Sequence, residues 1–256
     1  MLAETKTGND GNVVMVGAHL DSVLEGPGIN DNGSGAATVL DVAEAMRKLK
    51  PNNTVRFALW GAEEFGLLGS EFYVGNLSPA QQDAIALYLN FDMIGSPNYV
   101  RFVYDGDNTL NVQPPPPAGS AAIEQFFTDF YGARGLASEP TAFDGRSDYG
   151  PFIAAGVDIP AGGLFTGAEG VKTPAQQAVY GGTAGRQYDP CYHLACDTFD
   201  NVSLPVLDLN ADAVAAATFA YSQSTATVDA QQASATAASA ARAASGFTVR
   251  GNRATG

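Results

Sequence analysis

The chain has 256 residues, 45% of them hydrophobic, which is enough to build one large domain around a single core. Thirteen lysines and arginines against twenty-seven aspartates and glutamates give a formal net charge of -14. This charge argues against nucleic acid or an anionic membrane as the main partner. No run reaches the length of a membrane span, and the first residues lack the basic start and apolar core of a signal peptide.

Apolar runs and helix-spaced patterns alternate along the chain. Strands are predicted over 2–6, 12–18, 54–60, 86–92 and 99–104, with the turn-rich TGNDGN joining the first two as a hairpin. Apolar residues at helical spacing predict helices over 36–50, 66–76, 121–135 and 204–223. Residues 138–207 are rich in Gly and Pro, with short elements such as GPFIAAG and PAGGLF. Strands that alternate with helices predict an α/β sandwich around a mixed, mostly parallel sheet.

From about Gln223 the composition changes to Ala, Ser, Thr and Gln. We therefore divide the chain into a folded domain, residues 1–222, and an Ala/Ser/Thr-rich low-complexity tail, residues 223–256. The alanine-rich part of this tail is compatible with a transient helix.

Side chains that bind metals stand at or near the ends of the predicted strands. There are seven: His19, Asp21, Asp31, Glu63, Glu64, Asp92 and His193. In an open α/β sheet the carboxyl ends of the strands converge on one crevice, so residues remote in sequence meet there. Imidazoles with several carboxylates suit zinc, and the size of the set suits two zinc ions that share a carboxylate.

Each of these residues alone has an ordinary explanation. A lone histidine after a strand is usually a buried structural residue, and a pair of glutamates usually lies on a solvated surface.

Two cysteines, Cys191 and Cys196, stand in CYHLAC, where the spacing allows either a short disulfide loop or two free thiols. A disulfide there indicates an oxidising compartment.

Taken together, the motifs are far more specific. HLDS followed by PGINDNGSG, then WGAEEFGLLGS, NFDMIGS and CYH, stand in the order found in the M28 family of zinc aminopeptidases, which the chain resembles from about Leu2 to Tyr221. The resemblance implies the zinc exopeptidase fold, a three-layer α/β/α sandwich. It also implies a secreted monomer that removes N-terminal residues from peptides, with a preference for large apolar residues such as leucine.

The resemblance assigns a role to each metal-binding candidate. His19 and Asp92 would bind one zinc ion, and Glu64 and His193 would bind the other. Asp31 would bridge the two ions, and the peptide bond that follows it would be cis.

Other residues would manage protons and geometry. Glu63 resembles the general base that takes a proton from the attacking water and passes it to the leaving amine. Tyr192 resembles the tyrosine that donates a hydrogen bond to the oxyanion, although ordinary packing is the alternative. Asp21 would orient the ligating imidazole of His19, or else cap a turn. A disulfide between Cys191 and Cys196 would restrain the loop that carries His193.

The same resemblance suggests a substrate site. The backbone of Arg146, with the carboxylates of Glu63 and Asp92, would hold the free α-amine. The side-chain pocket would be lined by Met93, Gly145 and Phe165, which are otherwise plain core residues.

The resemblance also raises the possibility of a calcium site. Asp208 and Asp212 match a calcium-binding pair and share a helix face. The remaining ligands of the family lie in a segment before Leu2, so we expect at most a partial site and no bound calcium.

Two alternatives follow from the same scaffold. Family members carry a helix and a strand before the segment that resembles this chain, so we expect an N-terminally truncated domain and, as one alternative, a catalytically impaired or non-catalytic member. The other alternative is a glutaminyl cyclase, which uses one zinc ion and closes an N-terminal glutamine.

Overall fold

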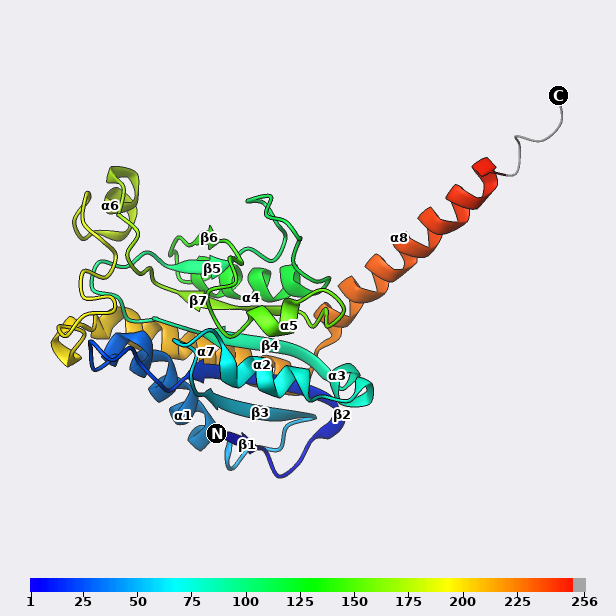
Figure 1. Ribbon diagram of the computed structural model, residues 1–256, viewed down its shortest axis with the longest axis horizontal. Coiled ribbons are helices and arrows are strands. Elements are labelled where there is room, and N and C mark those ends of the chain that lie inside the picture. The colour runs from blue at the N-terminus through cyan, green and yellow to red at the C-terminus, as the bar shows by residue number, and fades with distance from the viewer. Residues whose placement is uncertain (251–256) are drawn as a thin grey trace.

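Seven strands form one sheet in the computed structural model, which describes the backbone of residues 1–250 and the side chains of residues 1–243 (Figure 1). The strands are β1 (Leu2–Glu4), β2 (Asn9–His19), β3 (Asn53–Trp60), β4 (Ile85–Phe91), β5 (Phe102–Tyr104), β6 (Glu139–Thr141) and β7 (Ala161–Phe165). They lie in the order β1-β3-β2-β4-β7-β5-β6. The pairs β1–β3 and β5–β7 are antiparallel, and the other pairs are parallel.

Helices cover both faces of this sheet. They are α1 (Gly35–Met46), α2 (Leu68–Gly75), α3 (Pro79–Asp83), α4 (Ser120–Gly132), α5 (Gly150–Ile153), α6 (Pro174–Tyr180), α7 (Leu204–Gln223) and α8 (Ala226–Arg250), with short helical segments η1 (Ile29–Ser34) and η2 (Phe199–Asn201). None of the helices within residues 1–250 is both long enough and apolar enough to cross a membrane.

The alternation of side chains along β2 shows how the layers form. Val14 and Val16 point to one face and pack with α1, α4 and α7, whereas Val13 and Met15 point to the other face and pack with α2 and α5. All four side chains are buried. The expected three-layer α/β/α sandwich around a mixed, mostly parallel sheet is therefore present.

The edge of the sheet differs from the prediction. We predicted that TGNDGN joins the first two strands as a hairpin, but β1 pairs with β3, with Leu2 opposite Ala58. The reason is that β2 is buried on both faces and already has β3 and β4 as parallel neighbours on its two edges. In the loop-rich part of the chain, PAGGLF supplies β7, which lies between β4 and β5.

The C-terminal segment is helical. α7 ends at Gln223, one residue after the predicted boundary, and α8 then projects away from the sheet (Figure 1). Its beginning is docked: Val228 is fully buried in the core cluster, and Gln231 accepts a hydrogen bond from the backbone of Ala122 at 3.0 Å. Residues 233–243 are exposed, and residues 251–256 of the predicted tail lie outside the described part of the chain. The division into domain and tail stays a prediction.

Candidate active site

Four of the predicted site residues lie at the carboxyl ends of three adjacent parallel strands. His19 is the last residue of β2, Glu63 and Glu64 follow β3, and Asp92 directly follows β4. Parallel strands end at the same edge of a sheet, so these side chains are brought together although they are up to 73 residues apart. Asp31 reaches this edge from η1.

The carboxylate of Asp31 lies between the two histidines. Its Oδ1 is 3.2 Å from His19 Nε2, and its Oδ2 is 3.2 Å from His193 Nε2. Each imidazole has a second carboxylate beside it: Asp92 Oδ1 is 3.2 Å from His19 Nε2, and Glu64 Oε2 is 3.0 Å from His193 Nε2. The structure thus shows two groups of donor atoms that share one carboxylate.

These donors fit divalent metal ions. Two ligand atoms about 2.1 Å from a tetrahedral zinc ion are about 3.4 Å apart, close to the observed separations. Among the described side chains, Glu64 Oε1 is buried without a hydrogen-bond partner. Buried carboxylates that lie this close together are costly unless positive charge compensates them. Metal cations beside Asp31 would supply that charge, and the unpartnered Glu64 oxygen could serve as a ligand.

Glu63 lies beside the donors but farther from them. Its Oε2 is 4.0 Å from His19 Nε2, although a group made of Glu63, His19 and Asp92 is also compact enough to hold an ion. Burial, and then the charge of Asp92, raises the pKa of Glu63 to about 9. Burial and Asp31 likewise raise the pKa of Glu64 to about 7. Burial lowers the pKa of His19, but Asp92 and Asp31 outweigh this and hold it well above its ordinary value.

Asp21 has a different set of contacts from the one expected. The closer partner of His19 Nδ1 is the backbone carbonyl of Asp21, at 3.1 Å, whereas the Asp21 carboxylate is 3.8 Å away. That carboxylate accepts hydrogen bonds from the backbone N–H groups of Glu63, at 3.1 Å, and Glu64, at 3.3 Å. Asp21 therefore fastens the backbone of the two glutamates to the end of β2.

A buried chain of hydrogen bonds orients Asp92. Trp60 Nε1 donates to the Tyr88 hydroxyl at 2.8 Å, and this hydroxyl donates to Asn90 Oδ1 at 2.9 Å. Asn90 Nδ2 donates to Ser147 Oγ at 2.8 Å, and Ser147 Oγ donates to Asp92 Oδ2 at 2.6 Å. The other carboxylate oxygen, Asp92 Oδ1, faces His19 Nε2. We did not predict this role of Ser147, whose only signal in the sequence is its place beside DGR.

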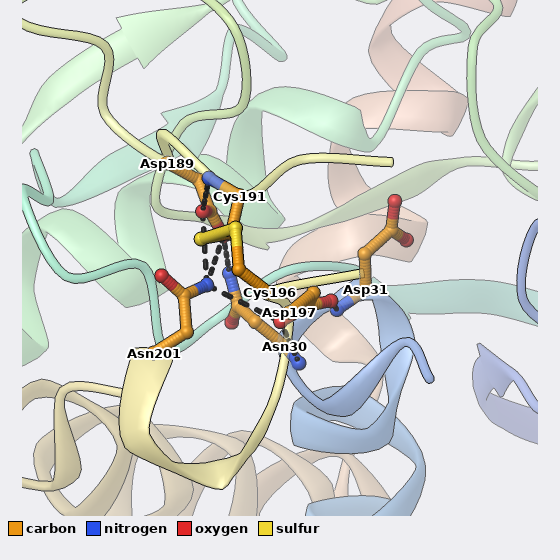
Figure 2. Close-up of a disulfide and its surroundings, with 7 residues drawn as sticks. All are labelled: Asn30, Asp31, Asp189, Cys191, Cys196, Asp197 and Asn201. Carbon is orange, nitrogen blue, oxygen red and sulfur yellow. Dashed lines mark hydrogen bonds between the residues drawn. A yellow bond between two sulfur atoms is a disulfide. The ribbon is translucent and has the colours of Figure 1, made fainter. Parts of the chain in front are cut away.

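The predicted disulfide is present and belongs to a larger network. Figure 2 shows its members: Asn30, Asp31, Asp189, Cys191, Cys196, Asp197 and Asn201. Asp197 accepts hydrogen bonds from the backbone N–H groups of Asn30, at 2.9 Å, and Asp31, at 3.0 Å. Asp189 accepts from Asn30 Nδ2 at 2.7 Å and from the backbone N–H of Cys191 at 2.8 Å. The loop with His193 is thus tied to the segment with Asp31. Neither Asp189 nor Asp197 was predicted as a site residue, although the two flank the cysteines.

Uncommon backbone conformations gather here. The peptide bond between Asp31 and Asn32 is cis, as the family resemblance implied. Met93 and His193 have φ values of 48° and 57°, in the left-handed region that few non-glycine residues adopt. Asn32 Oδ1 accepts a hydrogen bond from the Met93 N–H at 3.2 Å. Non-glycine residues held in the left-handed region are typical of functional sites.

A cavity of about 250 Å³ opens beside the donor atoms. Five of the six residues predicted for the substrate site line it: Glu63, Asp92, Met93, Arg146 and Phe165. Gly145 is the neighbour of Arg146, and its N–H donates to the Tyr149 hydroxyl at 2.9 Å. Phe102 also lines the cavity and stacks on Phe165, so part of the wall is apolar and aromatic.

Tyr192 lines the same cavity. Its ring stacks on the imidazole of His193 with 3.8 Å between centroids, and its hydroxyl accepts a hydrogen bond from Arg146 Nη2 at 3.1 Å.

The two aspartates considered for calcium, Asp208 and Asp212, are exposed on α7.

Comparison with known proteins places this geometry in a family. The model for Peptidase family M28 matches residues 1–218. The chain is 56% identical over 219 residues to an aminopeptidase of Pseudomonas aeruginosa (strain UCBPP-PA14), a match that covers 85% of this chain and 40% of that protein. It is 53% identical over 223 residues to leucine aminopeptidase 2 of Trichophyton rubrum, covering 87% of this chain and 44% of that protein.

Among solved structures, BSAP, a zinc aminopeptidase from Bacillus subtilis, has a similar fold. The TM-score is 0.68 at 26% identity, and the match covers 87% of this chain and 49% of that chain. The chain spans less than half the length of these relatives. Since the family model covers most of the sequence, and the fold agrees with it, the chain belongs to Peptidase family M28.

Proposed function

We propose that the protein is an aminopeptidase that holds two zinc ions and removes large apolar residues, such as leucine, from the N-termini of peptides. The position of Asp31 carries this proposal, because its two oxygens each lie 3.2 Å from a different imidazole. His19 and Asp92 would hold one ion with Asp31. Glu64 and His193 would hold the other.

The residues around the donors have the chemistry that peptide hydrolysis requires. The zinc ions would polarise the scissile carbonyl and make hydroxide available near neutral pH. Glu63 would take the proton of the attacking water and deliver it to the leaving amine, because it is nearly buried, faces the cavity and lies outside the shorter donor contacts. The Tyr192 hydroxyl would donate a hydrogen bond to the oxyanion.

The same cavity would select a free N-terminus. The substrate ammonium group would interact with the carboxylates of Glu63 and Asp92 and with the backbone carbonyl of Arg146. Met93 and Phe165 would contact the first side chain of the substrate, and their apolar surface favours leucine over charged residues.

The proposal is tested with a panel of aminoacyl p-nitroanilides, run with zinc analysis of the same sample. We expect about two zinc ions per chain, fastest hydrolysis of the leucine compound, and no hydrolysis of its N-acetyl derivative. One zinc ion with cyclisation of N-terminal glutamine would instead support a glutaminyl cyclase. Bound zinc without turnover of any compound would support a non-catalytic member of the family.

We further propose that the protein acts as a monomer outside the cell. The disulfide between Cys191 and Cys196 supports this location, because such bonds persist mainly in oxidising compartments.

A further inference from the structure

The guanidinium of Arg146 joins two other side chains at the mouth of the cavity. Its Nη2 donates to the Tyr192 hydroxyl at 3.1 Å, and its Nη1 donates to the Glu169 carboxylate at 2.8 Å. All three residues line the cavity beside the donor atoms. Arg146 was predicted to contribute only its backbone, so this side-chain contact is a separate feature.

The direction of the hydrogen bond matters for Tyr192. Arginine has donors and no acceptor, so the phenol oxygen must accept the hydrogen bond. The hydroxyl proton is then left without a role in this contact. The ring is also held, because it stacks on His193 at an interplanar angle of 27°. The phenol is therefore fixed at both ends, with its own proton available to another acceptor.

We infer that Arg146, held by Glu169, is a positioning residue that directs the hydroxyl proton of Tyr192 toward the oxyanion of the substrate. This inference rests on the proposed function, because it needs a peptide carbonyl in the cavity. It adds to that function a pair of residues that act on the reaction without touching the metal donors.

The ion pair between Arg146 and Glu169 is too exposed to solvent to serve mainly in stabilising the fold. The side chains of Arg146 and Glu169 are 55% and 47% exposed. Ion pairs at such exposure contribute little to stability. Loss of the pair should therefore leave the melting temperature nearly unchanged, and any large effect should fall on turnover.

The shape of the guanidinium distinguishes arginine from lysine at this position. Its planar fork serves two acceptors at once, whereas the ammonium of lysine is a compact point charge on a flexible stem. Arg146→Lys should therefore retain part of the effect, and Arg146→Met should lose all of it.

A double-mutant cycle on the zinc-loaded protein tests the inference. With leucine p-nitroanilide, we expect Arg146→Met to lower kcat about tenfold and to change KM less than about twofold, because a charged hydrogen bond is lost while the backbone stays in place. Glu169→Gln should lower kcat less, and Arg146→Lys should fall between wild type and Arg146→Met. In a Tyr192→Phe background, Arg146→Met should cause no further loss. Arg47→Met, at an exposed position next to α1, is the matched control.

A second measurement does not depend on turnover. With 3-fluorotyrosine in place of Tyr192, the fluorine resonance should move in Arg146→Met and stay in place in Arg47→Met. An unmoved resonance would overturn the inference. So would a double variant whose loss of kcat equals the product of the losses caused by Arg146→Met and by Tyr192→Phe alone, because the two residues would then act independently. In both cases a wild type that hydrolyses the leucine compound keeps the proposed function intact. A wild type without hydrolysis would overturn the proposed function, and this inference with it.

Discussion

Adjacent glutamates have different surroundings at the site. The Asp21 carboxylate accepts hydrogen bonds from the backbone N–H groups of Glu63 and Glu64, so it holds this stretch of backbone in place. Their side chains then diverge: Glu64 reaches within 3.0 Å of His193 Nε2, and Glu63 remains 4.0 Å from His19 Nε2. This divergence favours one metal ligand and one base.

A matched pair of substitutions separates these two roles. Glu63→Gln should lower kcat at least about 10²-fold, because it removes a general base, while two zinc ions stay bound. Glu64→Gln should lower the zinc content to about one ion per chain. Both variants keep size and backbone contacts, so zinc analysis beside the anilide assay distinguishes them. Full activity in Glu63→Gln would refute the assignment of the base.

Raised pKa values make the metal-free protein sensitive to pH. The pKa of Glu63 is raised to about 9 and that of Glu64 to about 7, in each case first by burial and then by a neighbouring carboxylate. Between about pH 5 and pH 9 the folded chain therefore binds more protons than the unfolded chain at these groups, and the free energy of unfolding falls as pH rises.

Thermal unfolding of the zinc-free protein measures this effect. Its melting temperature should be several degrees lower at pH 9 than at pH 6, and the Glu63→Gln, Glu64→Gln double variant should flatten the dependence. Zinc should stabilise the protein more at pH 8 than at pH 6, because metal binding displaces protons. A melting temperature that rises across this range would contradict the account.

At the scale of elements, two loops that are far apart in sequence are fastened together. Asp197 accepts the backbone N–H groups of Asn30 and Asp31, and Asn201 Nδ2 donates to both Asp189 and Asp197 (Figure 2). The loop of the second histidine and the segment of the shared carboxylate therefore keep a fixed separation.

Asp197→Asn tests the importance of this connection. An amide has one acceptor oxygen where the carboxylate has two, so one of the backbone N–H groups loses its partner. We expect zinc affinity to fall about 10- to 100-fold, as is typical when the groups that orient metal ligands are changed. Asp200→Asn, at an exposed position nearby, is the control and should bind zinc as wild type does. Equal affinities in the two variants would contradict the argument.

Some of this site was predictable from the sequence. His19, Glu63, Glu64 and Asp92 each stand at or just after an apolar strand, and the geometry of a parallel sheet brings such positions together. Their roles in metal binding and proton transfer stay predictions.

Other members of the site were not predictable in this way. Ser147, Asp189 and Asp197 act through hydrogen bonds formed only when distant loops meet, and no local pattern separates them from surface residues. The pairing of β1 with β3 was missed for the same reason, since it depends on how both edges of β2 are occupied.

At the scale of the whole molecule, buried residues continue past residue 222, since Thr225 and Val228 are both buried. Val228, near the start of α8, is buried in the core, and the helix then leaves the body of the protein (Figure 1). Thr225, just before this helix, accepts a hydrogen bond from Asn12 Nδ2 at 2.9 Å. The start of α8 therefore covers one end of the core.

Two shortened chains test this extension. A chain that ends at residue 234 keeps Val228 and should melt within about 2 °C of the full chain. A chain that ends at residue 223 exposes the surface that Val228 covers and should melt about 5 °C lower. Identical melting temperatures would show that the domain ends with α7.

The central claim is that one carboxylate, Asp31, joins two metal sites. Anomalous diffraction at the zinc edge from crystals of the zinc-loaded protein tests it most directly. We predict two peaks, one beside His19 and one beside His193, with Asp31 between them, and the loss of at least one peak in Asp31→Asn. A single peak in the wild type, or two peaks that Asp31→Asn leaves unchanged, would contradict the account.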